Sequence, residues 1–225
     1  MRPDLFGDVT VFSIGPLPIT RTVVTTLVLS ATLAVLGRLT ARAVVRRPAG
    51  RLAATARLTF GFLEDLVQQT AGSSSLVLTS FAGTLFLFIA ASAIAGQLPG
   101  VEAPTVKLPA TAALAASVFL AVPIAGIAKR GVWGYLREYF RPNPLLFPLH
   151  LVSEVSRTLA LALRLFGNMM SGSLVVGLAV ALVGLLVPIP LMALDLGIGL
   201  LQAYIFAVLA CVYVGAAIRV GEEER

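Results

Sequence analysis

The chain has 225 residues, of which 58% are hydrophobic and 12% are charged, and its mean hydropathy is +0.94. Soluble domains are typically about 45–50% apolar, so this composition excludes a soluble globular protein and indicates membrane insertion. The net charge of +6 does not indicate nucleic-acid binding, because the basic residues gather in short segments between apolar runs.

Five apolar runs are long enough to cross the roughly 30 Å hydrocarbon core of a bilayer. They lie near 22–37, 76–97, 109–128, 144–180 and 183–218. The last two exceed one perpendicular span, so we expect them to be tilted or kinked and to form a long hairpin with its turn at Pro188 and Pro190. The predicted fold is therefore an all-α membrane protein with about five membrane-inserted helices.

Basic residues predict how these spans are oriented. One group follows the first span and the other follows the third: Arg38, Arg42, Arg46, Arg47, Arg51 and Arg57, then Lys129, Arg130, Arg137 and Arg141. By the positive-inside rule both segments are cytoplasmic. We therefore expect the N-terminus, the loop 97–109 and the Pro188/Pro190 turn to lie outside.

The whole chain, 1–225, is interpreted as one membrane domain. Its parts are an outer N-terminal segment (1–21), three membrane helices with their loops (22–143), the long hairpin (144–218) and a cytoplasmic tail (219–225). Between the first two spans, residues 52–70 alternate apolar and charged positions. They form either an amphipathic helix on the cytoplasmic surface or a solvated loop helix. Residues 71–75 then form a hinge.

A stripe of polar residues runs along the fourth apolar run. Its members are three, four or seven positions apart and share one helix face: His150, Glu154, Arg157, Arg164, Asn168 and Ser171. A charge at mid-bilayer costs about 2.5–3.5 kcal/mol on insertion scales, so such a residue faces a protein interior, a wet cavity or a charged partner. Glu154 and Arg157 could also form an intrahelical ion pair near the surface. Arg164 has no carboxylate three or four residues away, so its partner must come from elsewhere.

The fifth run repeats this pattern, because Asp195, Gly199 and Gln202 are again four and three residues apart. In an antiparallel hairpin, Gln202 would approach Arg164 while Asp195 lies nearer the outer surface. Arg164 would then separate two polar regions, one opening to the cytoplasm (His150, Glu154) and one opening outward (Asn168, Ser171, Ser173, Asp195). Asp195 can alternatively be interpreted as an acidic residue that stabilises the start of its helix.

Three segments resemble subunit a of F-type ATP synthases. Residues 156–169, which read SRTLALALRLFGNM and are followed by Gly172, are similar to the signature of that family. LQAYIF at 201–206 resembles its last-helix motif, and GQLPG at 96–100 with Pro104-Thr105 resembles the exit of its second helix and its outer loop. The similarity spans most of residues 80–218 in the same order.

The resemblance implies a non-catalytic stator in a bacterial plasma membrane, beside a ring of c subunits and joined to peripheral stalk b-type subunits. In that family H⁺ or Na⁺ enters one half-channel, rides on a ring carboxylate and leaves by a second half-channel. Arg164 corresponds to the essential arginine and Gln202 to the glutamine that faces it. Arginine stays protonated, so it can hold a passing carboxylate ionised but cannot relay protons.

The chain departs from that family's pattern in both half-channels. Ser173 stands where the family usually has a glutamate, and Asp195 stands where it often has a histidine or an acid. His150 occupies a position that is usually acidic, while Glu154 matches the second acid there. We expect the outer carboxylate to have moved between helices, in a pattern similar to the sodium-linked bacterial branch.

Other functions are predicted less well by the sequence. A self-contained ion channel or secondary transporter is the alternative, and it would work without a partner ring. A membrane enzyme would need a motif such as HExxH, GxSxG or a phosphate loop, and the chain contains none of them. With one histidine and one cysteine, we expect no metal and no cofactor.

Overall fold

The computed structural model describes residues 10–14, 17–46, 50–72, 75–98, 101–139, 147–184 and 188–219. Six α-helices hold most of these residues: α1 (Arg21–Arg46), α2 (Arg51–Ala71), α3 (Leu76–Gly96), α4 (Leu108–Tyr139), α5 (Phe147–Val183) and α6 (Pro188–Arg219). A short antiparallel hairpin of β1 (Thr10–Ile14) and β2 (Leu17–Thr20) precedes α1, and a 3₁₀ turn, η1 (Pro104–Val106), precedes α4. The predicted helical membrane fold is confirmed.

Within the described residues, five helices are long and apolar enough to cross a membrane, as predicted. These spans are Arg21–Arg46, Leu76–Gly96, Leu108–Lys129, Phe147–Leu182 and Pro188–Ile218. The first runs past residue 37 to Arg46, in the direction in which the short apolar run 22–37 was open to extension. Basic side chains end an apolar run, but arginine is a good helix former and does not end the helix itself.

Two connections differ from the expectation. The basic segment after the third span is helical to Tyr139 instead of forming a loop, and the helix is broken at Gly131, whose φ of 74° favours a residue without a Cβ. Pro188 begins α6 instead of lying in the turn before it. A proline fits the first helical turn because its missing N–H would have no partner there.

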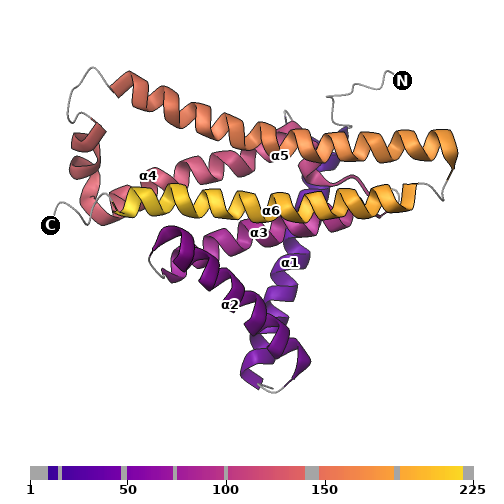
Figure 1. Cartoon of the computed structure of the whole chain (residues 1–225), viewed down its shortest axis with the longest axis horizontal. Coiled ribbons are helices and arrows are strands. Elements are labelled where there is room, and N and C mark those ends of the chain that lie inside the picture. The colour runs from indigo at the N-terminus through magenta and orange to yellow at the C-terminus, as the bar shows by residue number, and fades with distance from the viewer. Residues whose placement is uncertain are drawn as a thin grey trace.

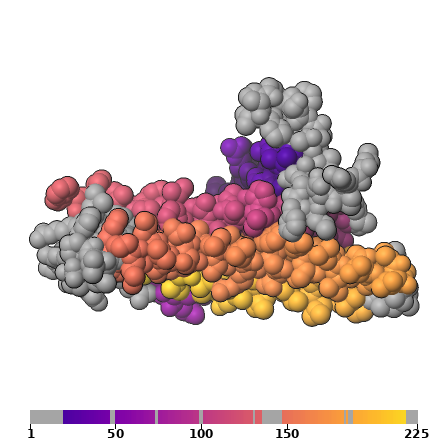
Figure 2. All heavy atoms as spheres, turned by 90° about the horizontal axis from the view of Figure 1, so that it is seen from above, coloured from indigo at the N-terminus to yellow at the C-terminus, as the bar shows by residue number. Residues whose placement is uncertain are grey.

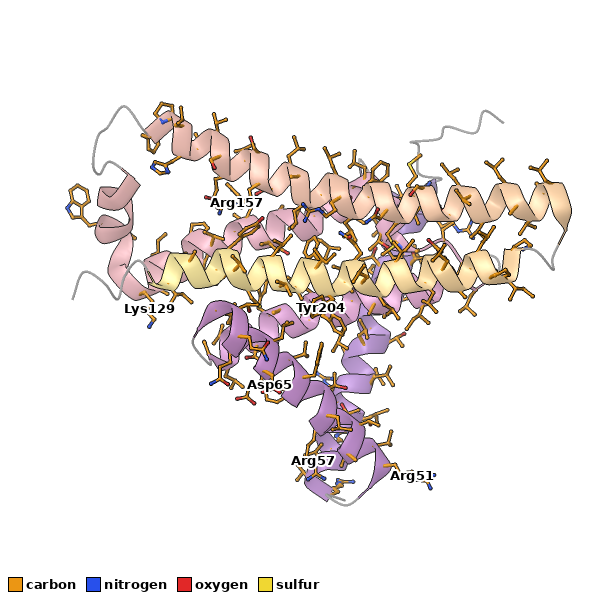
Figure 3. The ribbon with its side chains drawn as sticks, viewed as in Figure 1. Arg51, Arg57, Asp65, Lys129, Arg157 and Tyr204 are labelled. Atoms are coloured by element: carbon orange, nitrogen blue, oxygen red, sulfur yellow. The ribbon has the colours of Figure 1, made fainter. Side chains whose placement is uncertain are left out.

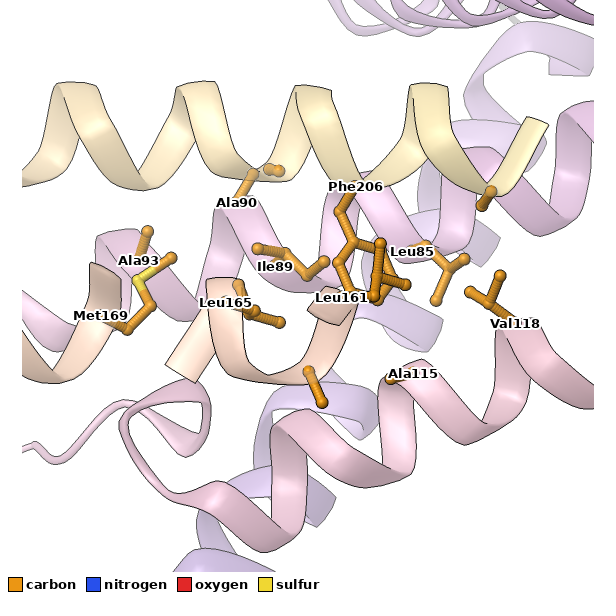
Figure 4. Packing of buried hydrophobic residues seen from close by; sticks show 13 residues of the cluster. Leu85, Ile89, Ala90, Ala93, Ala115, Val118, Leu161, Leu165, Met169 and Phe206 are labelled. Atoms are coloured by element: carbon orange, nitrogen blue, oxygen red, sulfur yellow. The ribbon is translucent and has the colours of Figure 1, made fainter. Parts of the chain in front are cut away.

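α5 and α6 form a long antiparallel hairpin, and α3 and α4 pack against it (Figure 1). The 37 residues of α5 span about 55 Å, which exceeds the hydrocarbon core and requires tilt or protrusion. One apolar cluster joins all four helices, and its members include Ile89 of α3, Val118 of α4, Leu165 of α5 and Phe206 of α6 (Figure 4). This cluster fixes the height of α5 relative to α6.

α1 and α2 project away from the hairpin as a V (Figure 1). A helix is present at the predicted position, 52–70, and Leu66 is buried on it. Leu63 and Val67 face the other helices, whereas Leu52 and Leu58 are 63% and 74% exposed. α2 ends at Gly72, whose φ of 69° and backbone hydrogen bond to Gln68 form the start of the predicted hinge.

Candidate functional site

Three side-chain contacts join α5 to α6 along the hairpin. The guanidinium of Arg157, which is labelled in Figure 3, lies 4.6 Å from the centroid of the Tyr213 ring. Asn168 Nδ2 donates a hydrogen bond to Gln202 Oε1 at 2.9 Å. The Asp195 carboxylate lies against Gly172. Arg157, Asn168 and Asp195 therefore each contact the facing helix, and the Asn168–Gln202 contact joins two positions that spacing picked out.

Arg157 does not form the intrahelical ion pair that the sequence allowed. Among the described residues no ion pair joins it to Glu154, and its cation–π contact with Tyr213 gives it a partner on α6. Such a contact contributes about 0.5–2 kcal/mol, depending on how far it is removed from water. Arg157 therefore fixes the hairpin near the start of α5 and the end of α6.

Gln202 is buried, with 3% of its surface exposed. A buried amide without a partner costs roughly 1–3 kcal/mol, so its contact with Asn168 stabilises the hairpin. Gln202 does not reach Arg164 by a hydrogen bond in the described structure; it meets Asn168, which lies one helical turn away from Arg164 on the same face.

Arg164 lies on the exposed side of α5, and no carboxylate of the described residues pairs with it. Its helix turns the buried side chains Leu161 and Leu165 toward the core. Leu159 and Leu163, on the outer side, are 56% and 49% exposed. Figure 2 shows α5 running along an uncovered face of the molecule. The arrangement presents the Arg164 cation beside exposed apolar side chains.

A cavity of about 680 Å³ lies at the end of the hairpin where α5 and α6 are connected, and we call it the turn-end cavity. Most of its wall is apolar and comes from α3, α5, α6 and the segment between α3 and α4. Its polar wall consists of Gln97, Glu102, Lys107, Ser173 and Asp195. Ser173 and Asp195, two of the positions at which the chain departs from the resembled family, thus line one space.

Asp195 is held within this cavity from two sides. Its Oδ2 accepts a hydrogen bond from Gln97 Nε2 at 2.9 Å, and its Oδ1 occupies the space that a side chain at Gly172 would fill. Ser173 is exposed and donates its hydroxyl to the carbonyl of Met170 at 2.9 Å. The carboxylate is therefore the strongest ion-binding group that α6 offers to this cavity.

The rim of the turn-end cavity carries charges of both signs. Arg21 Nη1 lies 3.8 Å from Glu102 Oε1, and the two side chains are 46% and 53% exposed. At this exposure an ion pair contributes at most about 1 kcal/mol, so Glu102 remains accessible to solvent ions. Lys107 lines the same space.

The second predicted polar region lies at the other end of α5. His150 is exposed and Glu154 is half-buried, and the Thr158 hydroxyl donates to the Glu154 carbonyl at 3.0 Å. These residues lie far along α5 from the turn-end cavity, with Arg164 between the two regions. No group of three or more His, Cys, Asp or Glu is placed to bind a metal in the described parts of the chain.

Sequence reasoning missed three polar residues of the cavity: Gln97, Glu102 and Lys107. They stand at the end of a helix or in a connection, where helical periodicity gives no signal. What the sequence does show is that these three residues lie in the short polar segment between the second and third predicted spans. That segment is predicted to lie on the same side of the membrane as the hairpin turn.

Comparison with known proteins gives consistent matches. The family described as ATP synthase A chain matches residues 19–215. The chain is similar to ATP synthase subunit a 2 of Bradyrhizobium sp., with 47% identity over 214 residues that cover 92% of each chain. It is 45% identical over 163 residues to ATP synthase subunit a 1 of Chlorobium luteolum, covering 72% of this chain and 73% of that one. It is 50% identical over 146 residues to ATP synthase subunit a 2 of Picosynechococcus sp., covering 65% and 63%.

Proposed function

Because the chain belongs to the ATP synthase A chain family, we propose that it is a stator in which Arg164 separates two ion half-channels beside a rotating ring of c subunits. Membership of this family makes it a multi-pass subunit of the ion-translocating membrane sector, which assembles with other ATP synthase subunits. The proposal concerns how its residues carry out that role. We also propose that b-type subunits of the peripheral stalk hold it still.

The observation that carries the proposal is the exposed position of Arg164. A cation at this depth needs a counter-charge, and no described carboxylate of its own chain supplies one. The exposed leucines around it, Leu159 and Leu163, form an apolar surface that a neighbouring membrane helix can cover. A ring subunit that presents one carboxylate on an apolar helix would satisfy both requirements.

The attraction between Arg164 and a ring carboxylate is of a size that lets the pair form and separate again. Two unit charges about 4 Å apart attract by roughly 4 kcal/mol at an effective dielectric constant of 20. The transmembrane potential supplies about 2.3 kcal/mol per charge for each 100 mV. Arg164 can therefore favour the ionised form of an arriving carboxylate and still release it when the ring turns.

The two half-channels follow from the polar regions on either side of Arg164. The turn-end cavity with Asp195 and Ser173 would serve the outer side, and the end of α5 with His150 and Glu154 would serve the cytoplasmic side. The hydrogen-bonded side chains of Asn168 and Gln202 would block a direct path for ions between the two half-channels beside Arg164. The transported ion is H⁺ or Na⁺, and its flow is coupled to ATP synthesis or hydrolysis in a bacterial plasma membrane.

The test replaces Arg164 in the intact enzyme and measures ATP synthesis in membrane vesicles under an imposed ion gradient. Arg164→Ala should abolish coupled synthesis, and Arg164→Lys should not restore it, because lysine lacks the planar donor fork and is more strongly hydrated. Arg42→Ala, an exposed arginine on α1, should leave synthesis unchanged. Normal synthesis by the Arg164→Ala enzyme would overturn the proposal. So would specific, saturable transport by the purified chain alone, which would indicate a self-contained channel.

A further inference from the structure

A residue outside the hairpin restrains the carboxylate of Asp195. Gln97 directly follows α3, and its backbone N–H bonds to the carbonyl of Ile94 at 3.1 Å, which fixes where its side chain begins. Its amide Nε2 donates to Asp195 Oδ2 at 2.9 Å. This hydrogen bond links the end of α3 to α6 across 98 positions of the sequence.

The two oxygens of Asp195 consequently have different surroundings. Oδ2 is held by Gln97, whereas Oδ1 lies over Gly172 of α5. We propose that Gln97 is a positioning residue for ion transfer in the outer half-channel: it holds Asp195 against α5 so that one carboxylate oxygen stays directed toward the ion path. The proposal rests on the function proposed above.

The chemistry of the neighbouring groups explains why an uncharged donor suits this position. Lys107 and Glu102 line the same cavity as Asp195. A cationic donor such as a lysine in place of Gln97 would neutralise the carboxylate toward an arriving cation. The Gln97 amide has donors but no charge, so it orients Asp195 while leaving that negative charge in place.

The test uses the intact enzyme in membrane vesicles and compares Gln97→Leu, which keeps the approximate side-chain size, with Ile94→Ala at the end of α3. Loss of a hydrogen bond to a charged group should slow synthesis by Gln97→Leu roughly tenfold or more. Ile94, which is 55% exposed and does not line the turn-end cavity, should tolerate alanine. The outer ion concentration that gives half-maximal synthesis should change at least about threefold in Gln97→Leu and stay constant in Ile94→Ala.

A double-mutant cycle separates positioning from a structural effect. If Gln97 acts through Asp195, Gln97→Leu should slow the wild-type enzyme but have no further effect in an Asp195→Ala background. Additive losses, or an unchanged outer ion dependence in Gln97→Leu, would overturn the proposal and leave the stator function intact. Full activity of Asp195→Ala would instead remove the proposed outer path itself. The ion titration needs the single variant alone, so it is decisive even where the Asp195→Ala enzyme is too slow to measure.

Discussion

Gly172→Ala is the smallest change that tests the geometry around Asp195. A Cβ at position 172 would overlap Asp195 Oδ1 and lie 2.7 Å from its Cγ. Atoms cannot remain at such a separation, so the carboxylate must rotate or α5 must move away from α6. Rotation would break the hydrogen bond from Gln97, because Oδ2 turns together with Oδ1.

The size of the effect follows from that hydrogen bond. Its loss corresponds to about 1.5–3 kcal/mol, which is a factor on the order of 10 to 100 in rate if the outer carboxylate limits ion entry. Alanine also favours a helix over glycine by about 1 kcal/mol, which acts in the opposite direction on folding. A fall in transport would therefore not come from a weaker helix.

Gly177→Ala is the matched control. Gly177 lies on the same helix and lines the same turn-end cavity, yet a Cβ there would meet nothing within 4 Å. Both variants would be assayed for ATP synthesis in membrane vesicles, with the amount of assembled enzyme measured by immunoblot. Equal rates for the two variants, whether both normal or both slow, would refute the contact between Gly172 and Asp195.

Two further predictions concern buried groups and access to the cavity. Ser92 and Thr105 are fully buried, and a hydrogen bond of 2.9 Å joins their hydroxyl groups. Ser92→Ala would leave the Thr105 hydroxyl without this partner, at a cost of about 1–3 kcal/mol. The variant should therefore lower the melting temperature of the solubilised complex. Adding Thr105→Val should recover part of that loss, and a further drop would contradict the reasoning. Ser173→Cys should react with a charged thiol reagent through the turn-end cavity, whereas Cys211, which is fully buried, should not. Labelling of Cys211 in the folded enzyme, measured by mass spectrometry, would refute the packing of α6.

The sequence predicted most of the helical fold, because an apolar run of about 20 residues between polar segments has few other interpretations. Some helices end later than the predicted spans, because a helix can continue beyond the part of it that is apolar enough to lie in a membrane. α1 continues to Arg46 and α4 continues past Gly131 because main-chain hydrogen bonds, not hydropathy, decide where a helix ends. The short strands β1 and β2 gave no periodic signal, since each has at most five residues.

The candidate site was predicted in part. Spacing alone put Arg164, Asn168 and Gln202 on facing stripes, and the structure brings the last two into contact. Spacing could not reveal that Gln97 binds Asp195, because that contact depends on how α3 packs against α6. Nor could it show which side of α5 is exposed, since the polar stripe and the buried face overlap at Leu161.

The matching contacts along the hairpin have a mechanical consequence. The Arg157–Tyr213 and Asn168–Gln202 contacts lie eleven residues apart on each helix, a distance of about 16 Å. Sliding α5 past α6 by one turn would break both contacts at once and would drive the Asp195 carboxylate off Gly172. The stretch of the hairpin between these contacts therefore resists sliding of one helix along the other. In the proposed stator, this resistance would keep Arg164 at a constant height beside the ring.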